Sequence, residues 1–121
     1  MSDEVLRIAF ISDEDEPPDL GVSFAIDLGD SEIASLMLNR TPAYERLLPE
    51  NEHGVTVSYG VEDNPPMLTA CRIDYERAEI VTTRKTYRLD LHRVDADDLK
   101  AAFAVLRKMN FDNCALLELP E

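Results

Sequence analysis

Apolar and polar side chains alternate with a period of two in several segments of this 121-residue chain, which favours a fold with a large share of β-sheet. The alternation is clearest in residues 21–28, which predict a half-buried strand. One face of that strand carries Val22, Phe24, Ile26 and Leu28, and the other carries Ser23, Ala25 and Asp27. The turn residues at 29–31 and the apolar stretch at 34–40 then predict an antiparallel partner strand.

Further segments also have strand character, and they are residues 5–11, 54–60, 68–75, 78–84, 86–93 and 114–119. The three segments between 68 and 93 are separated by short turns, which favours an antiparallel meander. Tyr59 and Tyr87 fall on the apolar faces of their segments, and we expect both rings to be buried.

A long helical pattern occupies residues 95–110. Asp95 can cap its first turn, and charges that suit the helix dipole follow at both ends, namely Asp97, Asp98, Arg107 and Lys108. The apolar stripe of this helix consists of Leu99, Ala102, Phe103, Leu106 and Met109. A short helical turn is expected near residues 42–48, because Pro42 suits the first position of a helix and Pro49 ends it.

This order of elements predicts an α+β fold. We expect an antiparallel sheet of about seven to eight strands, with the C-terminal amphipathic helix packed on one face and the short helical turn near 42–48. No repeat or linker divides the chain, so residues 1–121 are expected to form a single domain. The acidic stretch 12–20, which contains Pro17-Pro18, is interpreted as a loop.

Charge is the second strong feature of the sequence. Its 25 acidic residues outnumber its 12 Lys and Arg, for a net charge of −13, and residues 1–32 alone carry −9 because ten acids there accompany one base, Arg7. Such a chain is poorly suited to a nucleic-acid backbone or an anionic membrane, both of which attract Lys and Arg. We therefore expect a protein partner, with no nucleic acid and no membrane.

Motifs for catalysis and cofactors are missing from the sequence. The four glycines do not cluster, and His53 and His92 lie far apart without a CxxC motif, so neither a cofactor nor a metal is expected. Ser23 lies in a strand and not in the sharp turn of a nucleophile elbow. Cys71 and Cys114 lie in apolar, strand-like segments and are expected to pack in the interior. We interpret the chain as a protein without enzymatic activity.

Recognition is the function that remains. We predict that a partner contacts the acidic stretch and the short helical turn, through Asp13, Glu14, Asp15, Glu16, Asp19, Tyr44 and Glu45. Carboxylates presented to a basic partner accelerate association. Two other interpretations of the acidic run stay open: a solvated segment that aids solubility, or a weak Ca²⁺ or Mg²⁺ site without the spacing of an ordered cage.

Several segments together resemble a known family. They are SLMLNR at 35–40, TPAYERLLPE at 41–50, GVTVSYG at 54–60, the late meander, and DADDLKAAFAVLRKM at 95–109. In this order they resemble the small α+β immunity proteins of bacterial polymorphic toxin systems, in particular the tenth family in the usual numbering. The resemblance implies a cytoplasmic antitoxin that neutralises a cognate bacterial toxin by direct, non-catalytic binding.

Two alternatives to the immunity function are kept. One is a protein-interaction or structural domain that forms a homodimer, and the other is a small-ligand-binding domain or an enzyme with an unrecognised site. The first ten residues lack a secretory signal pattern, which predicts a cytoplasmic protein with free thiols.

Overall fold

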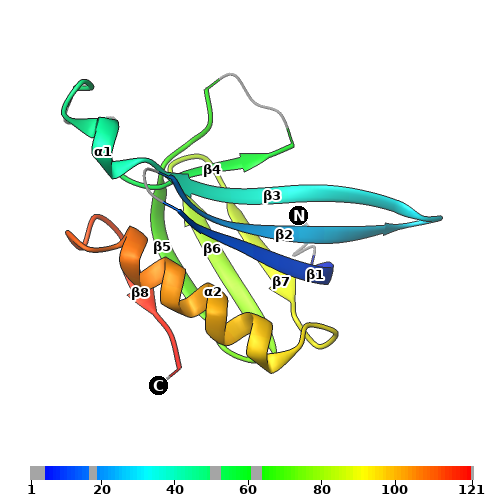
Figure 1. Ribbon diagram of the computed structural model, residues 1–121. Coiled ribbons are helices and arrows are strands. Elements are labelled where there is room, and N and C mark those ends of the chain that lie inside the picture. Colours follow the sequence, from blue (N-terminus) through cyan, green and yellow to red (C-terminus); the bar gives the residue numbers. More distant parts are fainter. Residues whose placement is uncertain (1–4, 17–18, 50–52, 61–63, 121) are drawn as a thin grey trace.

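A computed structural model describes residues 5–16, 19–49, 53–60 and 64–120. Within these residues eight strands and two helices follow one another along the chain (Figure 1). The strands are β1 (Val5–Glu16), β2 (Asp19–Gly29), β3 (Glu32–Arg40), β4 (Thr56–Tyr59), β5 (Leu68–Ile73), β6 (Arg77–Thr82), β7 (Thr86–Asp90) and β8 (Leu116–Glu118). The helices are α1 (Pro42–Glu45) and α2 (Ala96–Met109).

The strands form one mixed sheet in the order β4-β3-β2-β1-β7-β6-β5-β8. Neighbouring strands are antiparallel except for β1 with β7 and β5 with β8, which are parallel. The α+β class, the single C-terminal helix and the short helical turn are confirmed. The predicted antiparallel sheet of seven to eight strands is confirmed as a mostly antiparallel one of eight, and its two parallel pairs arise because β1 pairs with the last strand of the meander and β8 returns beside β5 after α2.

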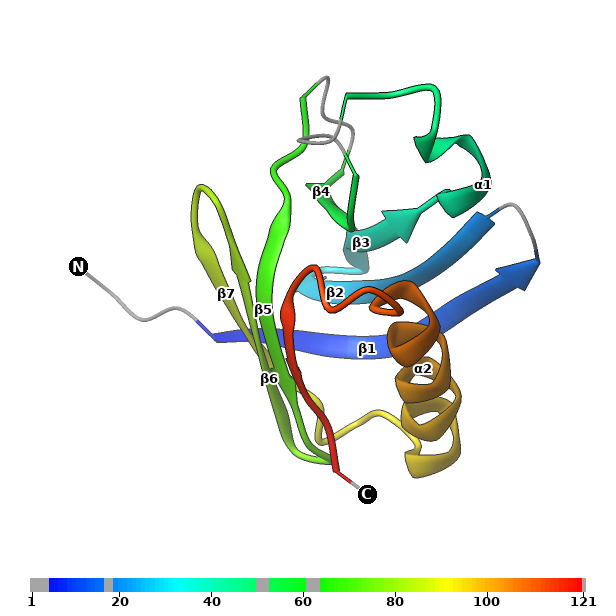
Figure 2. The same ribbon diagram turned by 90° about the vertical axis from the view of Figure 1, so that its left-hand side faces the viewer.

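The sheet curls strongly, so that β4, the first strand in the sheet order, comes back to the segment that leads into β5, the seventh. Thr56 bridges Met67, and the Leu68 amide donates to the Val55 carbonyl at 2.8 Å. Helix α2 lies across the inner side of the curve against β1 and β2 (Figure 2). Tyr87 is buried as expected, whereas Tyr59 stacks on it at 6.2 Å between ring centroids but stays 37% exposed at the end of β4.

Helix α2 follows its sequence pattern closely. The Asp95 side chain accepts a hydrogen bond from the Asp97 amide at 2.9 Å, which caps the helix. All five residues of the predicted apolar stripe are buried, and they pack on core side chains of β1 and β2 such as Ile8 and Phe24. The helix therefore closes the core on its open side. No helix in the described part of the chain is long and apolar enough to cross a membrane.

The acidic stretch is not a loop where the structure describes it. Strand β1 continues to Glu16 and pairs with β2 as far as Glu16 opposite Asp19, and Pro17-Pro18 lie outside the described residues. Residues 12–16 are exposed on both faces of the hairpin, because this part of it extends past the core. Its sequence therefore has no alternation of apolar and polar residues from which a strand could be predicted. At the far end of β2, Leu28 is 50% exposed for the same reason, although it was expected to be buried.

Candidate functional site

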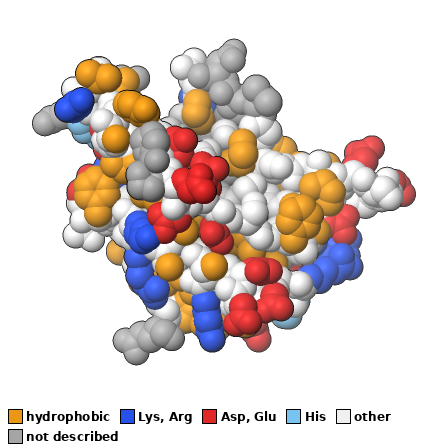
Figure 3. Space-filling view, in the orientation of Figure 1, with side chains coloured by type: hydrophobic (Ala, Val, Ile, Leu, Met, Phe, Trp, Pro, Cys, Tyr) orange, Lys and Arg blue, Asp and Glu red, His pale blue; other side chains and the backbone are white. Residues whose placement is uncertain are grey.

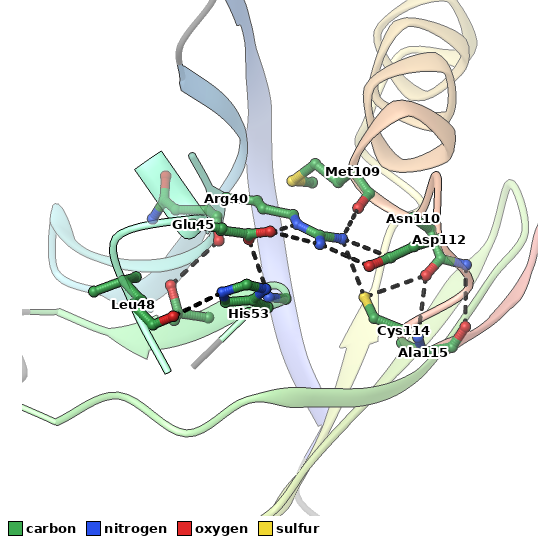
Figure 4. Close-up of polar contacts among 12 residues, drawn as sticks. Arg40, Glu45, Leu48, His53, Met109, Asn110, Asp112, Cys114 and Ala115 are labelled. Carbon is green, nitrogen blue, oxygen red and sulfur yellow. Dashed lines mark hydrogen bonds and ion pairs between the residues drawn. The ribbon is translucent and has the colours of Figure 1, made fainter. Parts of the chain in front are cut away.

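A buried arginine organises one end of the molecule. Arg40, the last residue of β3, is 3% exposed and lies on the core-facing side opposite Leu20. Its Nε and Nη2 donate to the two carboxylate oxygens of Glu45 at 2.8 and 2.9 Å. Its Nη1 donates to the Met109 carbonyl at 2.7 Å, and Nη1 and Nη2 each reach one Asp112 oxygen at 2.9 Å (Figure 4). We call this cluster the Arg40 hub.

The two carboxylates keep the hub ionised. Burial alone lowers the pKa of Arg40, but the hydrogen bonds to Asp112 and Glu45 outweigh it and raise the pKa above its ordinary value. The hydrogen bond from Arg40 lowers the pKa of Glu45 against the opposing effect of burial, and the Gly54 amide contributes at 3.1 Å. The same guanidinium lowers the pKa of Asp112 to about 2. All three groups are therefore charged at neutral pH.

The hub joins three segments that are distant in sequence: the end of β3, helix α1 and the turn that follows α2. A helix of four residues is unstable by itself, so α1 depends on such tertiary contacts. The Phe111 ring lies over the Arg40 guanidinium at 4.3 Å and adds a cation–π contact. Glu45 was predicted to touch a partner, but only 7% of it is exposed, so in this structure it positions α1 instead.

Apolar side chains are exposed around the hub. Tyr44 is 54% exposed, Leu47 75%, Leu48 44% and Phe111 60%. The first three come from α1 and the residues after it, and Phe111 comes from the turn after α2. Because Arg40 binds both segments, these side chains belong to one end of the molecule. We call them the apolar anchors.

The acidic hairpin formed by β1 and β2 ends beside α1, as both views show (Figures 1 and 2). Asp13 and Asp15 lie on the side that faces α2, where Asp15 forms an ion pair with Lys108. Glu14 and Glu16 lie on the opposite side, and Asp19 begins β2; all five are exposed. The acidic hairpin therefore ends on the same side of the molecule as α1, and Figure 3 shows a group of carboxylates (red) on the face that also carries the orange side chains at the upper left.

Metal-ligating side chains and thiols were the next groups to be located. No group of three or more His, Cys, Asp or Glu there could hold a metal ion. Burial raises the pKa of Cys71 to about 12, which leaves an inert thiol in the core, as the sequence predicted. Cys114 is exposed beside the hub, so the prediction that it packs in the interior is wrong. The turn after α2 places it outside the strand β8 that begins two residues later.

Sequence reasoning missed Arg40 and Asp112. Arg40 was interpreted only as the end of a strand, although the alternation of β3 already assigns it to the same face as Leu36 and Leu38. An arginine on a core face requires buried anionic partners, so the sequence of β3 already indicated an ion pair at Arg40. It could not indicate which acid is the partner, since Asp112 lies 72 positions away.

Comparison of the chain with protein-family models, with curated proteins and with solved structures gives no match. The resemblance to immunity proteins therefore stays a prediction.

Proposed function

We propose that this chain is a non-catalytic binding protein of the immunity type, which neutralises a cognate bacterial toxin by covering a basic surface of it. The observation that carries the proposal is the combination at one end of the molecule: exposed apolar anchors held by a buried hub, beside a hairpin of carboxylates. Protein interfaces combine such central aromatic or apolar residues with a polar rim.

Preorganisation supports this use of the surface. A binding surface on a four-residue helix would ordinarily lose entropy when it is ordered by a partner. Here the two hydrogen bonds between Arg40 and Glu45, and the one from Gly54 to Glu45, already fix α1 before any partner arrives. The hub has a net charge of −1, since one guanidinium is paired with two carboxylates, and its exposed part is the Asp112 carboxylate.

Charge supports a basic partner. The hairpin presents Asp13, Glu14, Asp15, Glu16 and Asp19, and the only cation paired with them among the described contacts is Lys108. Attraction between such a surface and a basic one raises the association rate, and salt weakens the effect. A toxin that acts on an anionic substrate such as nucleic acid carries a basic active surface, and covering that surface would block its activity.

The test uses the product of the gene that lies directly beside the gene for this chain. We expect it to be toxic when expressed alone in a bacterial host, and co-expression of this chain to restore growth. Tyr44→Ser should weaken the rescue, whereas Leu116→Ser should not, because Leu116 is similarly exposed at 51% but lies on β8. A neighbouring product that is harmless, or a toxic one that this chain neither binds nor neutralises, would contradict the proposal.

A further inference from the structure

The last strand of the sheet has a free edge. Strand β8 lies at the end of the sheet order and pairs on one side only, in parallel with β5. A strand at the edge of a sheet leaves every second backbone amide and carbonyl without a strand partner. The register of β5 and the contacts of Ala115 identify the residue of β8 whose backbone groups are left in this way.

The backbone of β5 gives the first indication. The Asp74 amide donates to the Arg77 carbonyl at 3.0 Å in the hairpin that joins β5 to β6, so the backbone groups of Asp74 face β6. Successive residues of a strand direct these groups to opposite sides, so those of Cys71, three positions earlier, face β8. Cys71 lies opposite Leu117 and therefore bonds to the residues on either side of Leu117. The amide and the carbonyl of Leu117 itself point away from β5.

A contact at Ala115 agrees with this direction. The Asn110 side chain, at the C-terminal end of α2, accepts a hydrogen bond from the Ala115 amide at 3.1 Å and donates one to the Ala115 carbonyl at 3.0 Å. Ala115 therefore directs its backbone toward α2, and Leu117, two residues later, directs its backbone to the same side. Asn110 makes the two hydrogen bonds that a neighbouring strand would make, so this edge already accepts a strand-like partner at one position.

The open part of the edge lies in a hollow between β8 and α2. Both ribbon views place β8 beside the C-terminal end of α2 (Figures 1 and 2). The hollow measures about 300 Å³ and is lined by Arg107, Asn110, Asn113, Leu117 and Leu119. Outside the ladder with β5, no hydrogen bond among the described residues involves the Leu117 backbone. Its amide and carbonyl are therefore available to a ligand in the hollow.

Arg107 supplies a positive charge at one end of the hollow. Its Nη2 donates to the Pro120 carbonyl at 3.1 Å, and it pairs with no carboxylate in the part of the chain that the structure describes. The next residue, Lys108, is by contrast paired with Asp15. A guanidinium without a counter-ion, beside a free backbone amide, is suited to bind a carboxylate.

We infer that the hollow between β8 and α2 binds an extended peptide, which adds to the sheet as a further strand and places an acidic side chain at Arg107. Strand addition obtains its affinity from main-chain hydrogen bonds and its selectivity from the side chains of alternate residues. Leu117 and Leu119 pack against the core and give such a peptide an apolar floor. The inference does not depend on the proposed function, because none of the residues that line the hollow belongs to the acidic hairpin or to the apolar anchors.

The length of the edge predicts weak binding. Strand β8 has three residues, and Pro120, which follows it closely, has no amide to continue a ladder. With Ala115 already bonded to Asn110, only the backbone from Leu117 onward is open to a peptide. We therefore expect a dissociation constant on the order of 0.1–1 mM.

Amide hydrogen exchange of the full chain, followed by NMR without any ligand, tests the free edge. The Glu118 amide faces β5 and should exchange slowly, whereas the Leu117 amide should exchange at least about tenfold faster. A Leu117 amide that is protected as well as that of Glu118 would mean that the edge is closed, and it overturns the inference.

A peptide titration followed by NMR tests the ligand. The probe is a synthetic six-residue peptide of alternating threonine and valine with one glutamate and blocked ends, added up to about 5 mM. We expect it to bind and to slow the exchange of the Leu117 amide. A version with glutamine in place of glutamate should bind about fivefold more weakly, and a version with a central proline, which lacks an amide, should not bind.

Variants of the protein locate the charge. Arg107→Gln should weaken binding of the glutamate peptide about fivefold and leave binding of the glutamine peptide unchanged. Lys100→Gln removes another exposed cation of α2, outside the hollow, and should change neither. Absence of binding up to the highest concentration overturns the inference. So does a proline peptide that binds as well as the others, or an Arg107→Gln variant that binds the glutamate peptide like the wild type.

Discussion

Replacing Arg40 by Met removes the cation of the hub and leaves Glu45 without its main partner. The Glu45 side chain is 9% exposed and would keep a hydrogen bond only from the Gly54 amide among the contacts described. Breaking a buried ion pair by removing one partner lowers the free energy of unfolding by about 3–5 kcal/mol. The Asp112 side chain is 43% exposed and can hydrogen-bond to water instead, so the loss of its ion pair with Arg40 adds little to the destabilisation. We expect a total loss of about 4 kcal/mol.

Urea denaturation at pH 7 measures this loss. The double variant Arg40→Met/Glu45→Met is the control, since it leaves no unpaired buried charge and should lie within about 2 kcal/mol of the wild type. In the single variant, burial without Arg40 raises the pKa of Glu45, and a group whose pKa is raised on folding gains stability as pH falls. The deficit should therefore shrink from pH 7 to pH 4. A loss under about 1 kcal/mol, or a double variant no better than the single one, would refute the reasoning.

Three further predictions concern the core, the thiols and the hairpin. Phe103→Ala should lower the free energy of unfolding by about 3–5 kcal/mol, because Phe103 is 2% exposed; a loss below about 1 kcal/mol in urea would contradict its core role. A thiol reagent should modify Cys114 in the native protein and Cys71 only after unfolding; equal rates would contradict the burial described. Changing residues 13–16 to Ser should alter the free energy of unfolding in urea by less than about 1 kcal/mol, since Asp15 makes only an exposed ion pair; a larger loss would make the hairpin a structural element.

Local patterns were sufficient to predict most of the secondary structure. The cap at Asp95 and the stripe through Phe103 specify α2, because helix capping and amphipathicity depend on neighbours three or four positions apart. The alternation in residues 21–28 likewise predicts β2. Strand partners are a different matter: the parallel pairing of β1 with β7 joins residues more than 80 positions apart, and no local signal specifies it.

For the candidate site, the structure bears on exposure alone. The hairpin carboxylates and Tyr44 are exposed, and their contact with a partner stays a prediction. Glu45 differs from them because its partner Arg40 points to the core side, and the sequence shows the charge of each residue but not their contact. The hairpin itself was mistaken for a loop, since strand pairing beyond the core leaves no alternation of apolar and polar residues to detect.

The central claim is that the hairpin and the apolar anchors dock a basic partner, and the association rate with the neighbouring gene product tests it most directly. Measured at low and at moderate salt, the wild type should associate fast and lose rate steeply as salt rises. The variant with Ser at residues 13–16 should associate more slowly, with a weaker dependence on salt, while Tyr44→Ser should mainly speed dissociation. The same salt dependence in the wild type and in the hairpin variant would contradict the account.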